Sequence, residues 1–154
     1  KMKSFARFIT KPKVKRAGRP IPITGVAQAG MSGLSKVQYW LNPAKKALPK
    51  NDPYFTTAPW KDAGILPPPE RWGMFDNGRL PHIPNQTDKD GNFLHWPPAN
   101  TLVHWATLLE DVKPGSYELR CRTVDRNGVG QPMPRPFQKS GGNLVQMIRL
   151  RVFA

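Results

Sequence analysis

The side chains that most often bind metals in proteins are present here but not at ligand spacing. The sequence contains three histidines, His82, His95 and His104, and one cysteine, Cys121. No histidine or cysteine lies three or four residues from any of these histidines, which is the spacing that local zinc sites use. We therefore predict no metal site and interpret the histidines as loop or strand residues.

The single cysteine is expected in the core. Cys121 lies in SYELRCRTVD, where Tyr117, Leu119 and Thr123 share its side of the alternation. A reactive thiol needs accessible, electropositive surroundings, whereas a buried free cysteine behaves as a small hydrophobe. One cysteine also excludes an internal disulfide, but it leaves the redox compartment open.

The chain lacks the common sequence signatures of catalysis. It has no phosphate loop and no dinucleotide fingerprint, and Gly30-Met31-Ser32-Gly33 lacks the flanking residues of a nucleophile elbow. We predict that this chain alone has no catalytic residues.

The most distinctive local pattern is VDRNGVGQPMPRP, residues 124–136. Asp125 at a strand end can accept hydrogen bonds from the amides of the following turn, and Asn127-Gly128 tolerates positive φ. Gln131 carries both a donor and an acceptor that could fix the departing chain, and Pro132 prevents the strand ladder from continuing. An ordinary hairpin turn is the alternative interpretation.

Five short segments are expected to position these residues. Residues 20–29, 34–41, 101–112, 116–125 and 144–153 are rich in β-branched and apolar residues, largely in alternation with polar ones. We expect the first two to pair like a hairpin through the turn at residues 30–33, and Lys113-Pro114-Gly115 to turn between two further strands. The pattern predicts an all-β antiparallel sandwich.

A proline-rich insertion interrupts these segments. Residues 42–100 contain 11 of the 18 prolines, so we expect neither a long helix nor a central strand there. Its aromatic residues could stack nucleic-acid bases, but packing against the domain is the favoured interpretation. We predict an ordered, packed excursion with little regular structure.

We divide the chain into a basic N-terminal segment or linker, residues 1–19, and one domain, residues 20–154, that contains the insertion. No apolar run approaches the ~18 residues of a membrane span, and the start does not resemble a signal peptide. We therefore expect no membrane partner.

Positive charge is concentrated in the first third of the chain. Residues 1–51 hold 12 Lys and Arg and no Asp or Glu, whereas the remainder holds 12 against 10, for a net charge of +14 overall. Such asymmetry can indicate a polyanion partner. Solvated strand faces and a loose basic terminus would produce it too, and this is the favoured interpretation.

The order of features resembles the C-terminal dimerisation domain of sulfite oxidase-like molybdenum-cofactor oxidoreductases, over roughly residues 3–154. The resemblance rests on ITGVAQAGMSGLSKVQYWL, on His104-Trp105 before the third strand, on PGSYELRCRTVDRNGVGQP and on the closing basic-apolar strand. Trp105, Asp125, Asn127, Gly128, Gln131 and Pro132 are its motif residues.

The resemblance implies an immunoglobulin-like sandwich that pairs with its twin and covers one side of the molybdenum site of a larger enzyme. It implies that the molybdenum cofactor and its cysteine ligand belong to a preceding domain, so that Cys121 is no ligand and this chain alone binds no cofactor. Some members send a basic residue from the segment after Gln-Pro toward an oxyanion pocket, which makes Arg135 and Lys139 candidates. The long insertion departs from the better-known sulfite oxidases, and the substrate could differ with it.

Two other roles remain open. One is a basic module for nucleic acid, the less expected partner, or for an acidic protein, carried by residues 1–51. The other, compatible with the dimerisation role, is docking of an electron-transfer protein by the basic front. The family resemblance weakly favours a periplasmic location.

Overall fold

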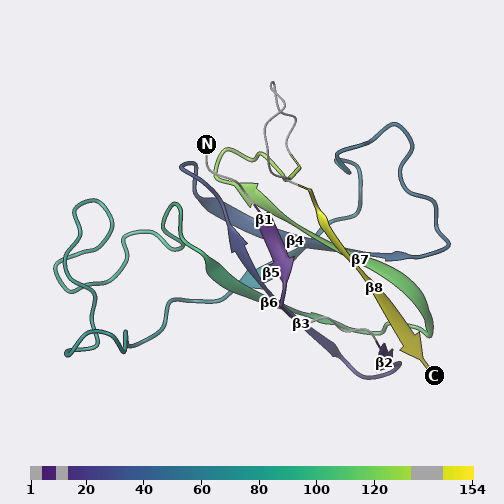
Figure 1. Ribbon diagram of the computed structural model, residues 1–154, viewed down its shortest axis with the longest axis horizontal. Coiled ribbons are helices and arrows are strands. Elements are labelled where there is room, and N and C mark those ends of the chain that lie inside the picture. Colours follow the sequence, from purple (N-terminus) through teal and green to yellow (C-terminus); the bar gives the residue numbers. More distant parts are fainter. Residues whose placement is uncertain (1–4, 10–13, 133–143) are drawn as a thin grey trace.

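The computed structural model describes residues 5–9, 14–132 and 144–154. These ranges form strands and no helix (Figure 1), so they contain no helix with the length and apolarity of a membrane span. The strands are β1 (Phe5–Phe8), β2 (Val14–Arg16), β3 (Ile21–Gln28), β4 (Leu34–Pro43), β5 (Lys61–Ile65), β6 (Val103–Leu109), β7 (Gly115–Asp125) and β8 (Gln146–Phe153).

The strands form one nearly closed, barrel-like sheet in the order β1-β3-β6-β5-β4-β7-β8-β2. Neighbouring strands run antiparallel, except that β2 runs parallel to β8. At the β1 edge a side chain links β1 to β8, because the amide of Phe8 donates to Oε1 of Gln146 at 2.6 Å. The prediction of an all-β, mainly antiparallel chain is confirmed.

The insertion contributes a central strand, which corrects the sequence prediction. β5 pairs with β4 on one side and with β6 on the other, so it joins the two halves of the sheet. It occupies a proline-free window between Pro59 and Pro67, where nothing prevents a short ladder. Because the residues on either side are rich in proline, the sequence pattern does not indicate a strand in this window.

The expected hairpin between residues 20–29 and 34–41 does not form. β3 pairs with β1 and β6, whereas β4 pairs with β5 and β7. The connection still turns tightly, because Gly33 adopts φ +72 and its amide donates to the Gly30 carbonyl at 3.0 Å. The turn carries the chain across the core from one half of the sheet to the other.

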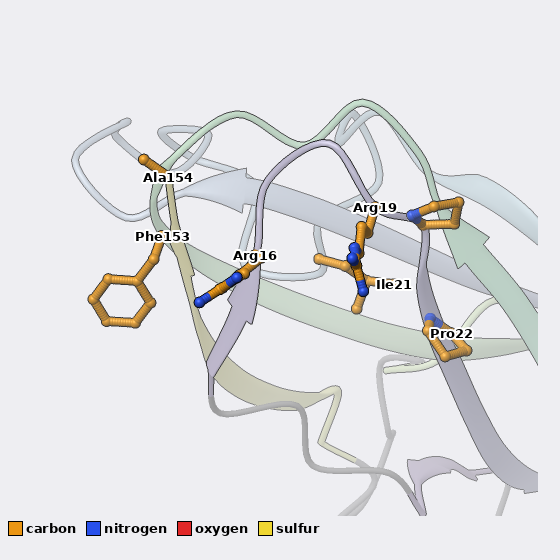
Figure 2. A pocket seen from close by; sticks show the side chains of 7 residues that line it. Arg16, Arg19, Ile21, Pro22, Phe153 and Ala154 are labelled. Carbon is orange, nitrogen blue, oxygen red and sulfur yellow. The ribbon is translucent and has the colours of Figure 1, made fainter.

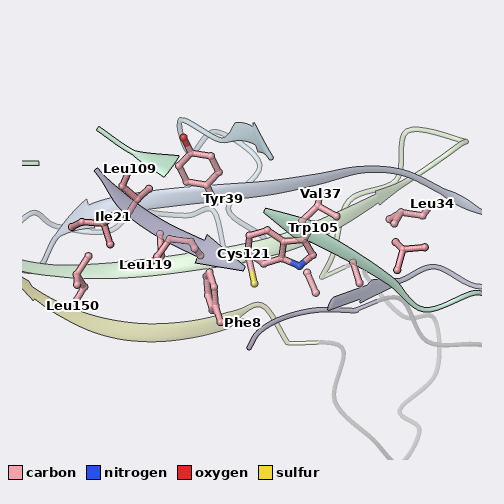
Figure 3. Close-up of a cluster of buried hydrophobic side chains, with 14 of the residues drawn as sticks. Phe8, Ile21, Leu34, Val37, Tyr39, Trp105, Leu109, Leu119, Cys121 and Leu150 are labelled. Carbon is pink, nitrogen blue, oxygen red and sulfur yellow. The ribbon is translucent and has the colours of Figure 1, made fainter. Parts of the chain in front are cut away.

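The core fills the inside of the curved sheet around Trp105 (Figure 3), which is fully buried. Alternating residues of β4, β7 and β8 face it as predicted, including Val37, Leu119, Cys121 and Leu150. Gly25 of β3 lies flat against the Trp105 ring, so that a β-carbon there would overlap the indole. The Phe8 ring meets the same indole edge to face, with centroids 5.5 Å apart.

Residues 1–19, expected to be a basic segment or linker, contribute β1 and β2 to the two edges of the sheet. Ala6 and Phe8 of β1 are buried in the same core as the later strands. This part of the chain therefore helps to close the domain.

The rest of the insertion forms two lobes at opposite ends of β5 (Figure 1): the first lobe, residues 44–60, and the second lobe, residues 66–102. In the second lobe Phe93 lies between Trp72 and Trp96, with ring centroids 5.9 and 5.2 Å away. The Trp96 indole donates to the Leu66 carbonyl at 2.9 Å. These aromatic residues therefore pack on one another, and of the three rings Trp96 also packs against the core cluster, as the prediction of a packed excursion expects.

The first lobe covers the outer face of β4 and β7 and buries side chains expected to face water. Strand alternation alone places Trp40 and Arg120 on the solvent side, opposite Val37 and Cys121, yet they are 5% and 6% exposed. The Phe55 and Trp60 rings lie 5.8 and 5.9 Å from the Trp40 ring. A strand can be buried on both faces and still alternate apolar and polar residues. Alternation therefore does not indicate that the outer face of β4 and β7 is covered.

Candidate functional site

The strand end at Asp125 is a buried hydrogen-bond hub, which we call the strand-end anchor (Asp125, Gln131 and their partners). Oδ1 of Asp125 accepts the amides of Asn127 and Val129, both at 2.9 Å, as expected for a turn fixed by its first residue. Oδ2 accepts the hydroxyl of Ser32 at 2.8 Å. One carboxylate therefore ties the β7 turn to the connection between β3 and β4.

Gln131 is the second half of the strand-end anchor and is 1% exposed. Its Oε1 accepts the amide of Ala6 at 3.1 Å and that of Thr123 at 3.4 Å, and its Nε2 donates to the Leu144 carbonyl at 2.7 Å. This amide side chain joins β1, β7 and the start of the last strand. The predicted use of its donor and acceptor is confirmed by these bonds.

The turn between the two anchor residues follows the expected backbone chemistry. Gly128 adopts φ +79, and its amide donates to the Asp125 carbonyl at 3.0 Å. Pairing of β7 with this segment ends at the bridge between Val124 and Gly130, whose last bond runs from the Gln131 amide to the Thr123 carbonyl at 2.8 Å, immediately before Pro132. Asn127 takes part through its backbone amide.

Trp105 has a packing role. Its Nε1 is buried and has no hydrogen-bond partner among the described residues. The ring instead supplies the apolar surface on which Phe8 and Gly25 pack. It lies in the centre of the core, away from any surface that a partner could touch.

An arginine–aromatic stack (Trp40, Phe55, Trp60, Arg120 and Arg122) lies on the outer face and was not identified from the sequence. The Arg120 guanidinium lies 5.2 Å from the Trp40 centroid and 5.4 Å from the Phe55 centroid. The Arg122 guanidinium lies 4.3 Å from the Trp60 centroid. Arg120 also pairs with Glu118 at 2.7 Å. The alternating arginines of RCR and the tryptophan of APWK were the available signal.

Arg122 differs from Arg120 in its charge partners. Burial lowers the pKa of Arg122, while the charge of Asp52 opposes that shift. Its Nε donates to Oε1 of Gln38 at 2.9 Å, and Nε2 of Gln38 donates to Asp62 at 2.8 Å. Arg122 therefore reaches Asp62 only through a neutral amide.

A basic surface pocket of about 570 Å³ lies where β2, β3 and β8 meet. Arg16, Arg19 and Phe153 line it, and both arginines are exposed (Figure 2). Arg149 and Arg151 are exposed on neighbouring β8, where the Arg151 guanidinium lies 4.8 Å from the Phe153 centroid. These four arginines make this edge of the sheet basic.

No protein-family model matches the chain, and no curated protein matches it.

The structure brings together Asp125, Asn127, Gly128, Gln131 and Pro132, with Trp105 apart from them in the core. Arg135 and Lys139, the candidates for an oxyanion pocket, lie outside the described residues. Within the described ranges no group of three or more His, Cys, Asp or Glu could hold a metal. His82 lies in the second lobe, with Nδ1 3.1 Å from the Thr87 carbonyl oxygen.

Cys121 is a core residue in a setting that suppresses its reactivity. The side chain is fully buried, and burial raises the pKa of its thiol far above the ordinary value. A thiolate ligand for molybdenum must be deprotonated and reachable, so Cys121 does not fit that role. The described groups can anchor the fold and attract anions.

Proposed function

We propose that this chain is the non-catalytic dimerisation domain of a sulfite oxidase-type molybdenum oxidoreductase. The strand-end anchor carries the proposal, because the residues of the resemblance, Asp125 to Gln131, form one hydrogen-bonded unit around two buried side chains. That unit gives a physical reason for these residue types to occur together in this order. The parent enzyme's upstream domain would hold the molybdenum cofactor, and this domain would cover one side of it.

The finer architecture under this proposal is an immunoglobulin-like sandwich. The sheet has two curved halves, β1-β3-β6 and β4-β7-β8-β2, which face each other across the core and are joined by β5. The two halves would act as the two layers of the sandwich. Such domains commonly pair through one sheet face or edge.

The proposal is tested on the longer protein that would contain this chain. That longer protein should contain molybdenum, which elemental analysis measures, and it should oxidise sulfite or a related oxyanion. In sedimentation it should have twice the mass of its monomer. The dimer should bury at least about 1,000 Å². A monomeric product, or one without molybdenum, would refute the proposal.

A second candidate, a basic module for an acidic partner, is favoured by the exposed arginines at the β2–β8 edge. Arg16, Arg19, Arg149 and Arg151 are exposed there, while Glu118, the facing acid of β7, is paired with Arg120. An acidic electron-transfer protein would suit this edge and is compatible with the dimerisation role.

Salt dependence tests this second role. Anisotropy titrations with an acidic protein and with a generic oligonucleotide should be run between 50 and 200 mM salt, a range over which six or more phosphate contacts cost roughly a thousandfold in affinity. The Arg149→Gln/Arg151→Gln double variant should bind the acidic protein more weakly and with a shallower salt slope. If the affinity for the acidic protein is independent of salt, or is unchanged in the double variant, this second role is wrong.

A further inference from the structure

A second hollow, of about 540 Å³, lies beside the strand-end anchor on the outer face of β4 and β7. The first lobe and the turn after β7 form its rim. The side chains and backbone that line it belong to Lys36, Gln38, Tyr54, Thr56, Arg122, Val124, Gly128, Val129, Gly130 and Pro132. We call it the Arg122 pocket.

Arg122 supplies a held, half-buried cation to this pocket. Its guanidinium is stacked on Trp60 at 4.3 Å, and its Nε is fixed by Gln38 at 2.9 Å. The Nη1 end lies next to Gly130, where a β-carbon would come within 3.4 Å of it. The stacking and the Gln38 bond orient the fork, which leaves the two Nη groups as donors for a ligand.

The nearby carboxylates are already occupied. Oδ1 of Asp52 accepts hydrogen bonds from the amide and hydroxyl of Thr56, and Oδ2 accepts those of Thr57, all at 2.8 Å. Both oxygens of Asp62 are taken by Lys36 at 2.9 Å and by Gln38 at 2.8 Å. Among the described residues Arg122 makes no ion pair within 4.0 Å, and the charge of Asp52 acts on it without direct contact.

The other walls are largely apolar. Val129 and Tyr54 are 40% and 39% exposed, and Val124 and Pro132 are half-buried beside them. A simple inorganic anion would leave these surfaces in water. A ligand with an apolar body would cover them while its charged end reaches Arg122.

We propose that the Arg122 pocket binds an organic carboxylate, with the carboxylate on the Arg122 fork and an apolar body against Val124, Val129 and Tyr54. A planar guanidinium accepts a carboxylate through two parallel hydrogen bonds, which suits the fixed orientation of this side chain. The proposal is independent of the dimerisation role, and its residues are distinct from Arg135 and Lys139.

The binding test uses the 154-residue chain with phenylacetate and hexanoate as probes, followed by calorimetry and by amide chemical shifts. Saturable binding with shifts at Gly128 and Gly130 is expected. Sulfate should bind much more weakly, because it gains nothing from the apolar walls. Sulfate binding as tight as phenylacetate would overturn the organic class of ligand, and no saturable binding would overturn the site.

Variants test which side chains bind. Arg122→Met should weaken phenylacetate binding about tenfold or more, the usual effect of losing a charge-assisted hydrogen bond. Arg122→Lys keeps the charge and is the milder change for folding. Its affinity for phenylacetate should still fall several-fold, because lysine lacks the fork. Val129→Ser should weaken phenylacetate but leave sulfate unchanged.

Arg71→Met is the charge-matched control, because Arg71 is an exposed arginine of the second lobe that lines neither the Arg122 pocket nor the basic pocket at β2 and β8. It should bind phenylacetate like the wild type, and an equal loss of affinity in Arg71→Met and Arg122→Met would mean that only the net charge matters. A short peptide ending in leucine, compared with its amidated form, distinguishes the source of the carboxylate. Tighter binding of the free peptide than of phenylacetate assigns the pocket to a protein C-terminus, and the reverse order assigns it to a small acid.

Discussion

At the scale of single residues, the fold depends on polar side chains that each satisfy several buried groups. Asp125 is 5% exposed and serves donors from two segments, and Gln131 links three. Removing such a group leaves buried or partly buried partners without their hydrogen bonds, which costs more than the hydrogen bonds themselves contribute.

Asp125→Ala should lower the free energy of unfolding by about 3 kcal/mol, since it leaves the hydroxyl of Ser32 and the amides of Asn127 and Val129 without their acceptor. Asp125→Asn keeps one acceptor oxygen and should cost about 1 kcal/mol. Urea unfolding measures both, with the exposed Asp76→Ala as control. Equal stability of Asp125→Ala and Asp76→Ala would contradict the role of the anchor.

Gly25→Ala should be among the most damaging small substitutions, because its β-carbon would overlap the Trp105 ring and the Arg7 carbonyl oxygen. Overpacking of a core typically costs about 1–3 kcal/mol, and backbone contact on one side places this variant at the upper end or beyond. Gly64→Ala is the matched control in β5, since its β-carbon would meet the Ala106 carbonyl at 3.5 Å, an ordinary contact. Thermal unfolding should separate the two variants by several degrees.

The Cys121 thiol should make stability fall at high pH. Its ordinary pKa is 9.0, and burial raises the folded-state pKa well above that. Above about pH 9 the unfolded chain loses this proton while the folded chain keeps it, so stability decreases as pH rises and is unaffected by this group below that pH. Urea unfolding at pH 8 and pH 10 should show a loss about 1 kcal/mol larger in the wild type than in Cys121→Ala. Equal losses would mean that the thiol titrates in the folded state.

At the scale of elements, sequence patterns predicted strands well and their partners poorly. Alternation located β7 and β8 because one face of each is buried, and a period of two follows from that. β5 has only five residues and no strict alternation, so only its neighbours in space define it as a strand. The pairings of β3 and β4 likewise depend on long-range contacts that no local pattern records.

The same difference between local patterns and long-range contacts applies to the candidate site. The turn chemistry of Asp125 and Gly128 is local, so the sequence predicted it. The arginine–aromatic stack combines β4, β7 and the first lobe, and residues so far apart in the chain give no shared local signal. Strand alternation alone therefore puts Arg122 on a solvated face rather than in a pocket.

Trp60→Ala should release the first lobe from the sheet while the core stays folded. It removes the ring under Arg122 and the contact with Trp40, at a cost of about 1–2 kcal/mol for a half-buried aromatic residue. Limited trypsin digestion should then cut faster at Lys45, Lys46 and Lys50. Tyr54→Ala, an exposed change in the same lobe, should be cut at the wild-type rate. Unchanged digestion of Trp60→Ala would show that the lobe is held by other contacts.

At the scale of the whole molecule, the two ends of the chain meet across the sheet. β2 pairs with β8, and the β1 edge is linked to Gln131 and Gln146 by hydrogen bonds from Ala6 and Phe8. A chain shortened to begin at residue 20 would therefore lose both edge strands and expose the β3 and β8 backbones. Such a fragment should unfold at lower urea concentration and associate through these open edges, which sedimentation would detect.

Because β5 lies within the insertion, the length of the second lobe can change without breaking the sheet. The second lobe begins after β5 and ends before β6, so a short linker in its place would leave each strand with its neighbours. Excision of residues 42–100 as one block would instead cut the sheet between β4 and β6. A new binding loop can therefore be grafted in place of the second lobe, whereas β5 must be kept and the first lobe covers Trp40 and Arg120.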